Sequence, residues 1–232
     1  MLLYIVRHGD PIYNPDSLTE LGKKQAEAVA KRLAQHGIDK IYSSPLIRAQ
    51  QTAEPTAVLT KKEIVVNPFF SENNAVKYFW DTRKEKNGWL MNTMRNELRS
   101  TVKKYGENWF NDPRFEGVPV KEGRDFFLEE SDKFFDSLGY KHDRENCRYT
   151  TENPSEERIA VFCHEGFGLS WIATILDIPL PIFWANFGLS HSNVTIIHFG
   201  GKDCTPKILS HSNDSHIYKE GLPTKYNNLR FI

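Results

Sequence analysis

The 232-residue sequence is poor in cysteine and has no long apolar run. Its three cysteines, Cys147, Cys163 and Cys204, are too few and too irregularly spaced for a disulfide framework or a thiolate metal site, which favours a reducing compartment. No apolar stretch approaches the roughly 18 residues that a membrane helix requires, and the start of the chain lacks the charged region and cleavage site of a signal peptide. We therefore expect a cytoplasmic protein that is neither exported nor inserted in a membrane.

The chain also lacks an excess of charge of either sign, internal repeats and low-complexity segments. Lys plus Arg and Asp plus Glu each number 30, so no overall field favours nucleic acid or an anionic membrane surface, and any anion site must be local. A hydrophobic content of 39% with 15 Phe indicates a sizeable core. We expect a single domain over residues 1–232 that includes a large insertion.

The first nine residues combine a buried strand with chemistry at its end. Leu2 to Val6 form a continuous β-prone run, as in a strand buried on both faces of a parallel sheet. The run leads directly into Arg7, His8 and Gly9. Open α/β sheets bind ligands at the carboxyl ends of their strands, so this tripeptide occupies the position of a site.

Three further predicted strands end in the same way. A short strand ending at Ser43 is followed by a helix from Leu46 to Leu59, with Arg48 in its first turn. The strand Glu63 to Val66 precedes Glu72, and the strand Ile159 to Cys163 leads into His164. Because parallel strands present their carboxyl ends at one edge of the sheet, these side chains are expected to converge.

The remaining predicted elements alternate with these strands. Asp10 to Asp16 is expected to be a loop, followed by a helix that a Ser17-x-x-Glu20 capping box starts and Gly37 ends. Pro55 is expected to kink the helix that carries Arg48. The other expectations are helices at Arg124 to Leu138 and Leu169 to Ile178, a loop at Tyr140 to Glu157, strands at Asn193 to Phe199 and Lys207 to Ser210, and a turn-like tail at Asp214 to His216.

The segment from about Ala75 to Gly123, the 75–123 segment, interrupts this alternation. It has little β pattern, and its apolar residues Leu90, Met94, Leu98 and Val102 recur at helical spacing. We interpret it as a helical, lid-like insertion over the sheet edge. Its Trp80, Trp89 and Trp109 are expected to form a small core of their own rather than a stacking platform, although they remain candidates for substrate selection.

Two guanidinium groups beside two imidazoles form a pocket suited to a phosphoryl group. Arg is always charged, and its forked donors match phosphate oxygens. One imidazole can then attack phosphorus while the other groups stabilise charge on the equatorial oxygens. No metal or other cofactor is needed for this chemistry.

The motifs resemble those of the histidine phosphatase superfamily, with the phosphoglycerate mutase-like fold. The matching motifs, in order, are Arg7-His8-Gly9, Asn14, Leu18-Thr19-x-x-Gly22, Ser43-Ser44-Pro45-x-x-Arg48-Ala49-x-x-Thr52-Ala53 and His164-x-Gly166. They cover the chain from both ends and leave the 75–123 segment uncovered. The resemblance implies an α/β three-layer sandwich with a mostly parallel sheet.

The resemblance also implies roles for individual residues. His8 would be the nucleophile that becomes phosphohistidine, with Arg7, Arg48 and His164 as the phosphate clamp. Asn14 matches a phosphate-contacting position, although a loop-capping role is an equal alternative. Glu72 matches the proton donor, with Asp81 as a rival. Asp10, Glu165 and His216 stay outside the catalytic set: Asp10 as a turn residue, Glu165 as a pocket-rim or solvated residue, and His216 as a structural histidine.

These features predict a metal-independent phosphomonoester hydrolase that acts on a small phosphorylated metabolite. A phosphoglycerate mutase is the first alternative. It is less favoured because Asn14 is followed directly by the segment from Pro15 to Thr19. The longer insert that the cofactor-dependent glycolytic mutases carry at this point is missing. A non-catalytic phosphate-binding module is the second alternative, and it is less favoured because a module that only binds has no need of His8 or Glu72.

Overall fold

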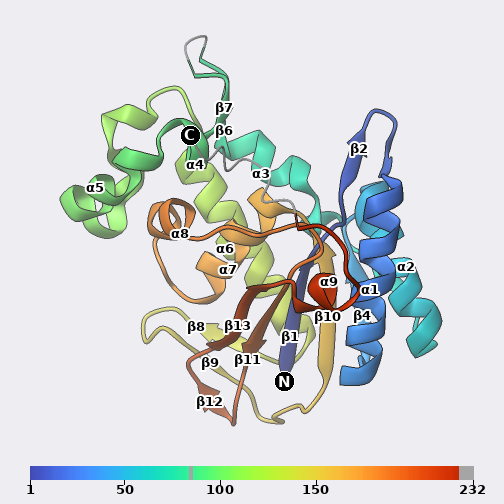
Figure 1. The fold of residues 1–232 in the computed structure, drawn as a ribbon. Helices are drawn as coiled ribbons and strands as arrows, with labels where there is room; N and C mark the ends of the chain where they lie inside the picture. Colours follow the sequence, from blue (N-terminus) through green and yellow to red (C-terminus); the bar gives the residue numbers. More distant parts are fainter. Residues whose placement is uncertain (84–85, 225–232) are drawn as a thin grey trace.

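A six-stranded sheet forms the centre of the computed structural model, which describes residues 1–83 and 86–224 (Figure 1). The strand order is β13-β11-β1-β10-β4-β5. In that order the strands are Lys207–Asn213, Val194–His198, Leu2–Arg7, Arg158–Cys163, Lys40–Ser43 and Ile64–Val66. Strands β1, β10, β4 and β5 run parallel to one another. Strand β11 pairs antiparallel with both β1 and β13. The mostly parallel sheet is therefore confirmed, with the 207–210 strand at its edge as predicted.

Helices cover both faces of the sheet, because successive β1 side chains point to opposite faces. Tyr4 and Val6 pack among residues of α1 (Glu20–His36) and α2 (Ile47–Thr60). Leu3 and Ile5 belong to a larger core on the other face. The helices of that face are α3 (Glu72–Phe79), α6 (Val120–Ser137), α7 (Glu165–Ile175) and α8 (Leu180–Asn186). The result is the predicted three-layer α/β sandwich.

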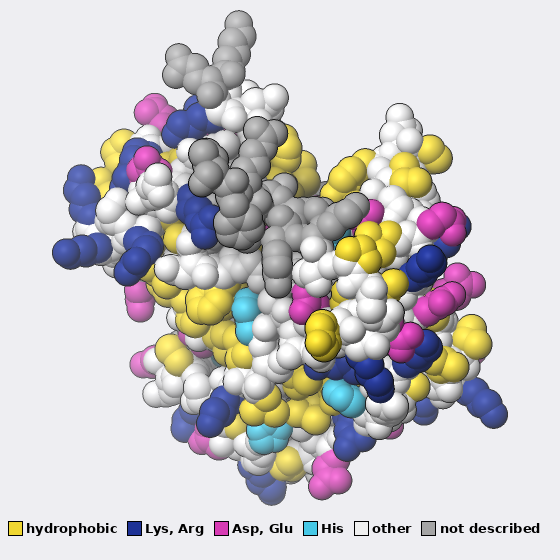
Figure 2. Space-filling view, in the orientation of Figure 1, with side chains coloured by type: hydrophobic (Ala, Val, Ile, Leu, Met, Phe, Trp, Pro, Cys, Tyr) yellow, Lys and Arg dark blue, Asp and Glu magenta, His cyan; other side chains and the backbone are white. Residues whose placement is uncertain are grey.

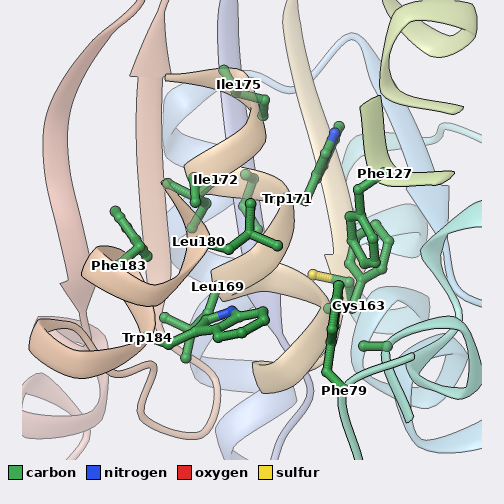
Figure 3. Packing of buried hydrophobic residues seen from close by; sticks show 14 of the residues in the cluster. Phe79, Phe127, Cys163, Leu169, Trp171, Ile172, Ile175, Leu180, Phe183 and Trp184 are labelled. Carbon is green, nitrogen blue, oxygen red and sulfur yellow. The ribbon is translucent and has the colours of Figure 1, made fainter. Parts of the chain in front are cut away.

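The larger core is dominated by aromatic rings (Figure 3). Phe127 of α6 and Phe79 of α3 lie with ring centroids 5.6 Å apart. Phe79 also meets Trp184 of α8 edge to face at 4.7 Å. Such geometry is favourable for aromatic pairs beyond the area they bury. These contacts fix α3, whose first residue is Glu72, relative to the sheet.

The N-terminal region differs from the prediction in two respects. Instead of a loop, residues 10–18 include a hairpin of β2 (Pro11–Tyr13) and β3 (Asp16–Leu18). Helix α1 is capped by Thr19, whose side chain accepts from the Gly22 amide, so the Ser17 capping box was wrong. Ser17 cannot cap the helix because pairing of the hairpin places it in strand β3. Helix α2 continues through Pro55 as one helix.

The 75–123 segment is largely helical but contains a short hairpin. The hairpin consists of β6 (Trp80–Asp81) and β7 (Gly88–Trp89). The helical pieces that follow are α4 (Leu90–Thr93), α5 (Arg95–Tyr105), and the 3₁₀ turns η2 (Gly106–Asn111) and η3 (Pro113–Phe115). The apolar spacing through Met94 predicts one helix, whereas Met94 separates α4 from α5 with a non-helical conformation. Helix α5 then packs beside α8.

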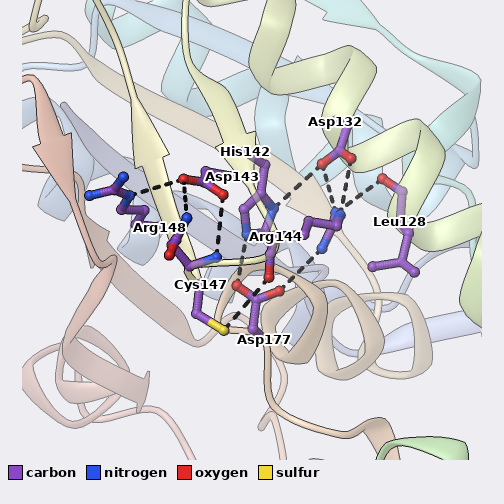
Figure 4. Close-up of polar contacts among 9 residues, drawn as sticks. Leu128, Asp132, His142, Asp143, Arg144, Cys147, Arg148 and Asp177 are labelled. Carbon is purple, nitrogen blue, oxygen red and sulfur yellow. Dashed lines mark hydrogen bonds and ion pairs between the residues drawn. The ribbon is translucent and has the colours of Figure 1, made fainter.

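The predicted loop at 140–157 was wrong, because β8 (Lys141–Asp143) and β9 (Arg148–Thr150) pair there and β12 (Asp203–Cys204) joins them. Polar contacts attach this small sheet to the helices (Figure 4). His142 donates through Nε2 to the Asp177 carboxylate at 2.8 Å, and its Nδ1 lies 3.5 Å from Asp132. Arg144 pairs with both carboxylates, at 3.2 and 2.6 Å. Every side chain of β8 and β9 except that of Tyr149 is polar or charged, so no apolar run marked these strands.

The C-terminal half contains two elements that were not predicted. The predicted helix at 169–178 is α7 at 165–175 followed by the separate α8, since Pro179 and Pro181 start a new helix. The turn-like tail is the short helix α9 (Ser215–Lys219), which packs on α1. Cys147, Cys163 and Cys204 are free thiols. Within residues 1–83 and 86–224 we find no helix with the length and apolar character needed to span a membrane.

Candidate active site

The register of the sheet brings His8 and His164 together. Arg7 of β1 is paired with Cys163 of β10, so the residues that follow them leave the sheet side by side. The two imidazole rings lie with centroids 5.1 Å apart. Both residues are buried, with 2% and 0% of their surface exposed. The predicted convergence of strand ends is thus present for the two histidines.

Backbone contacts fix the tautomer of His8. Its Nδ1 lies 2.7 Å from the Gly9 carbonyl oxygen, which can only accept a hydrogen bond, so Nδ1 carries the proton and Nε2 the lone pair. Burial, followed by the charges of neighbouring groups such as Arg7, holds the pKa of His8 well below its ordinary value. The imidazole is therefore neutral and nucleophilic at neutral pH. Gly9 is required because a Cβ there would stand 2.6 Å from the Gly22 carbonyl oxygen.

Arg7 and Arg48 supply two buried guanidinium groups. Arg7 donates to the Leu189 carbonyl and lies 3.0 Å from a Glu165 carboxylate oxygen. Arg48 pairs at 2.7 Å with Asp16, which also accepts from the Ile47 amide at the start of α2. These contacts orient both cations toward the end of β1.

Several donors of this cluster have no protein partner in the described part of the chain. They are Nε of Arg7, Nε of Arg48 and Nδ1 of His164. The other ring nitrogen of His164, Nε2, is 2.7 Å from the Ser44 hydroxyl. Burial, with Arg48 and Arg7 nearby, holds the pKa of His164 well below its ordinary value. Unpartnered buried polar atoms are costly, and an anion seated here would satisfy them.

Glu72 stands at the N-terminus of helix α7. Its two carboxylate oxygens accept hydrogen bonds from the amides of Gly166, at 3.0 Å, and Phe167, at 2.7 Å. Burial raises the pKa of Glu72 to about 7, although the two amides and Arg7 act in the opposite direction. A carboxyl group with that pKa exchanges a proton readily near neutral pH, which is what general acid catalysis requires.

The structure places two of the candidate residues away from this cluster. Asp81 is buried in an ion pair with Arg83 at 2.6 Å, and the hydrogen bond from Arg83 lowers its pKa, so it holds no proton to donate. Asn14 is exposed in the turn of the β2–β3 hairpin, outside the residues that line the pocket. Its neighbours Tyr13 and Asp16 contact Arg48 instead.

A pocket of ≈ 540 Å³ joins these groups to the 75–123 segment. Figure 2 shows the surface hollowed between that segment and the β2–β3 hairpin. At one end it is lined by Arg7, His8, Arg48 and Glu72, and at the other by the 75–123 residues Val76, Trp80, Gly88, Trp89, Met91, Asn92 and Thr93. Trp109 instead packs in the core against Trp184. The expectation of a small separate core thus describes none of the three tryptophans: Trp80 and Trp89 line the pocket, and Trp109 joins the main core.

Sequence reasoning missed several side chains beside the reactive groups. Ser44, which orients His164, lies in the Ser-Ser-Pro motif but was given no role. Asp16 had no local signal. Glu165, left open between rim and solvent, is a pocket residue paired with Arg7. The buried ring of His191 lies 5.6 Å from that of His8 and 3.4 Å from Asp10. His216 is buried and contacts the Ser192 hydroxyl at 3.1 Å.

Comparison with known proteins agrees with this geometry. The model of the histidine phosphatase superfamily (branch 1) matches residues 3–213. The chain belongs to this superfamily. A putative phosphoserine phosphatase 2 of Hydrogenobacter thermophilus is 24% identical over 212 residues, which cover 88% of this chain and 92% of the relative. A probable phosphoglycerate mutase of Yersinia pestis is 41% identical over 81 residues, 31% of this chain and 38% of the mutase.

Solved structures of the histidine phosphatase superfamily share the fold. A mutant phosphoserine phosphatase of Entamoeba histolytica in complex with phosphoserine superposes with a TM-score of 0.62 at 20% identity, covering 93% of this chain and 98% of that one. A mycobacterial glucosyl-3-phosphoglycerate phosphatase superposes at 0.58 with 18% identity, covering 91% and 98%. Superfamily membership and the phosphatase relative of similar length support a phosphoric monoester hydrolase.

Metal ligation is a separate question for this site. Among the residues that the structure describes, no cluster of three or more His, Cys, Asp or Glu is arranged to hold a metal ion.

Proposed function

We propose that the protein hydrolyses small phosphomonoesters through a phosphohistidine on His8. The observation that carries this proposal is the state of two groups in one pocket: a neutral His8 with its lone pair on Nε2, and a Glu72 carboxyl group with a pKa of about 7. A nucleophile and a proton donor with matched protonation states are what a two-step phosphoryl transfer needs.

In the first step, Nε2 of His8 attacks phosphorus and the bond from phosphorus to the ester oxygen breaks. The protonated Glu72 gives its proton to the leaving alkoxide, so the products are an alcohol and phosphohistidine. Arg7, Arg48 and His164 stabilise the charge on the equatorial oxygens through the donors that lack a protein partner.

In the second step, a water molecule attacks phosphorus and the bond from phosphorus to Nε2 breaks. The Glu72 carboxylate takes a proton from this water, which restores the acid and releases inorganic phosphate. His8 returns to its neutral form with Nδ1 still donating to the Gly9 carbonyl. Glu72 thus acts as acid and then as base, which a pKa near 7 permits in both directions.

Hydrolysis is favoured over the mutase reaction. The relatives of similar length and fold are named for phosphatase activity on phosphoserine or glucosyl-3-phosphoglycerate, whereas the mutase relative matches 31% of this chain. Lid-like closure by the 75–123 segment, a cytoplasmic location and a phosphate contact for Asn14 belong to the same proposal. The Asn14 contact would require the β2–β3 turn to move toward the pocket, because this side chain is exposed and outside the pocket lining.

The test is to trap the intermediate. Enzyme mixed with p-nitrophenyl phosphate and denatured in alkali should carry an acid-labile phosphoryl group on the peptide that contains His8. His8→Ala should lose both this group and turnover, while His198→Ala, which removes an exposed imidazole on β11, should keep both. Normal turnover by His8→Ala, or inhibition by a metal chelator, would contradict the mechanism.

A further inference from the structure

The end of the pocket away from the phosphate clamp has an aromatic wall. Trp80 and Trp89, paired across the β6–β7 hairpin, meet edge to face with centroids 5.6 Å apart. Trp80 also donates to the Asn87 side chain at 3.1 Å. Trp89 lies against Gly166, where a Cβ would stand 2.6 Å from its Cη2 atom. The indole rings are therefore held in place, and both line the same pocket as Glu72.

The charged groups of the pocket lie at the phosphate end. Of the described residues that line it, the cations are Arg7 and Arg48, and each already pairs with a carboxylate. The polar groups that line the rest of the pocket are uncharged: the amides of Asn73 and Asn92 and the hydroxyl of Thr93. The Thr93 oxygen is buried and has no partner in the described structure.

We infer that the alcohol part of the substrate is an uncharged, polyhydroxylated ring, as in a sugar monophosphate. This inference rests on the proposed function. The C–H face of such a ring packs on an indole, and its hydroxyl groups can bond to Asn73, Asn92 and Thr93. Each part of the wall then has a partner on the substrate.

Two other classes of ester fit this wall less well. A carboxylated ester without an ammonium group, such as 3-phosphoglycerate, would place a second anion near Glu72 and Glu165, without a further cation among the described lining residues to pair with it. A plain aryl phosphate would pack on the indoles but leave the Thr93 hydroxyl unpaired, which costs binding energy.

The experiment compares kcat/KM for glucose 6-phosphate, p-nitrophenyl phosphate, glycerol 1-phosphate, phosphoserine and 3-phosphoglycerate. The sugar ester should exceed 3-phosphoglycerate by tenfold or more (~1.4 kcal/mol in binding to the transition state), and should exceed phosphoserine, which lacks a ring to pack on the indoles, by a smaller factor. Trp89→Ala should raise KM for the sugar ester by about three- to tenfold, the strength of a single aromatic contact, and leave the KM of glycerol 1-phosphate nearly unchanged. A loss of kcat that acts through Glu72 would be shared by both alkyl esters.

Two gentler variants keep the test independent of folding. Trp89→Phe should restore most of the loss, and Thr93→Val, which preserves side-chain shape, should weaken the sugar ester and spare the aryl ester. Preference for a carboxylated ester, or an equal rise in KM for all esters in Trp89→Ala, would overturn the substrate inference alone. If no ester released phosphate, the proposed function and this inference would both fail.

Discussion

The indole of Trp89 covers Gly166 so closely that no side chain fits between them, and the amide of that glycine donates to Glu72. Because Trp89 and Glu72 both contact Gly166, the ring lies close to the carboxyl group, and we expect it to limit access of water to that group. Burial is the main cause of the raised pKa of Glu72, so removing the ring is expected to lower this pKa from about 7 toward its ordinary value.

The first prediction concerns the pH profile. Glu72 must be protonated to act as an acid, so kcat on an alkyl phosphate should fall as pH rises through about 7. In Trp89→Ala this alkaline limb should move to lower pH, and in Trp89→Phe it should move less. An unshifted limb in Trp89→Ala would mean that the ring does not set the protonation of Glu72.

The second prediction distinguishes the two carboxylates. Glu72→Gln should reduce kcat on an alkyl phosphate by about a hundred- to ten-thousand-fold, and on p-nitrophenyl phosphate far less, because that leaving group needs little protonation. Asp81→Asn weakens the contact with Arg83, so it should lower the melting temperature while keeping the ratio of the two rates. The opposite pattern would make Asp81 the donor.

The third prediction concerns Ser44 as a positioning residue. Its hydroxyl lies 2.7 Å from Nε2 of His164, and Ser44→Ala removes this contact without adding bulk. We expect kcat to fall by about tenfold, the size of one hydrogen bond, with a smaller change in KM. Ser44→Thr should recover part of the rate, whereas a purely structural role would lower stability and leave kcat unchanged.

The fourth prediction concerns stability and His142. Burial alone would lower its pKa, but Asp132 and Asp177 overcome this and raise it, despite the charge of Arg144. Because the pKa of His142 is raised in the folded state, the charged imidazole stabilises the fold fully at pH values below the unfolded pKa of about 6.5. This stabilisation is lost as pH rises through the folded pKa.

His142→Gln should therefore reduce the free energy of unfolding by roughly 1 to 3 kcal/mol at about pH 6 and by less at about pH 9. Urea unfolding at several pH values measures this difference. His198→Gln, on an exposed side chain, is the matched control. A loss that is the same at every pH would show that packing against Tyr149, rather than charge, fixes His142.

The sequence was sufficient to predict the strands that carry His8 and His164, since strands buried in a parallel sheet are continuous apolar runs. It could not predict β8 and β9, whose side chains are mostly polar. It also could not predict that Trp80 and Trp89 line the pocket whereas Trp109 packs in the core. Those outcomes depend on packing between segments far apart in the chain. The partner of Arg48, Asp16, depends on a hairpin that local signals did not reveal.

The position of β1 in the sheet has a consequence for synthesis of the protein. The strand that ends beside His8 is made first, but its two hydrogen-bonded neighbours begin at residues 158 and 194. During translation one edge of β1 stays unpaired until β10 (Arg158–Cys163) has been made, and the other until β11 (Val194–His198) has been made. Long-range pairing of this kind slows folding, and unpaired edges invite association between chains. Nascent chains that stall before β10 are therefore expected to be clients of chaperones, and none of them can hold phosphate.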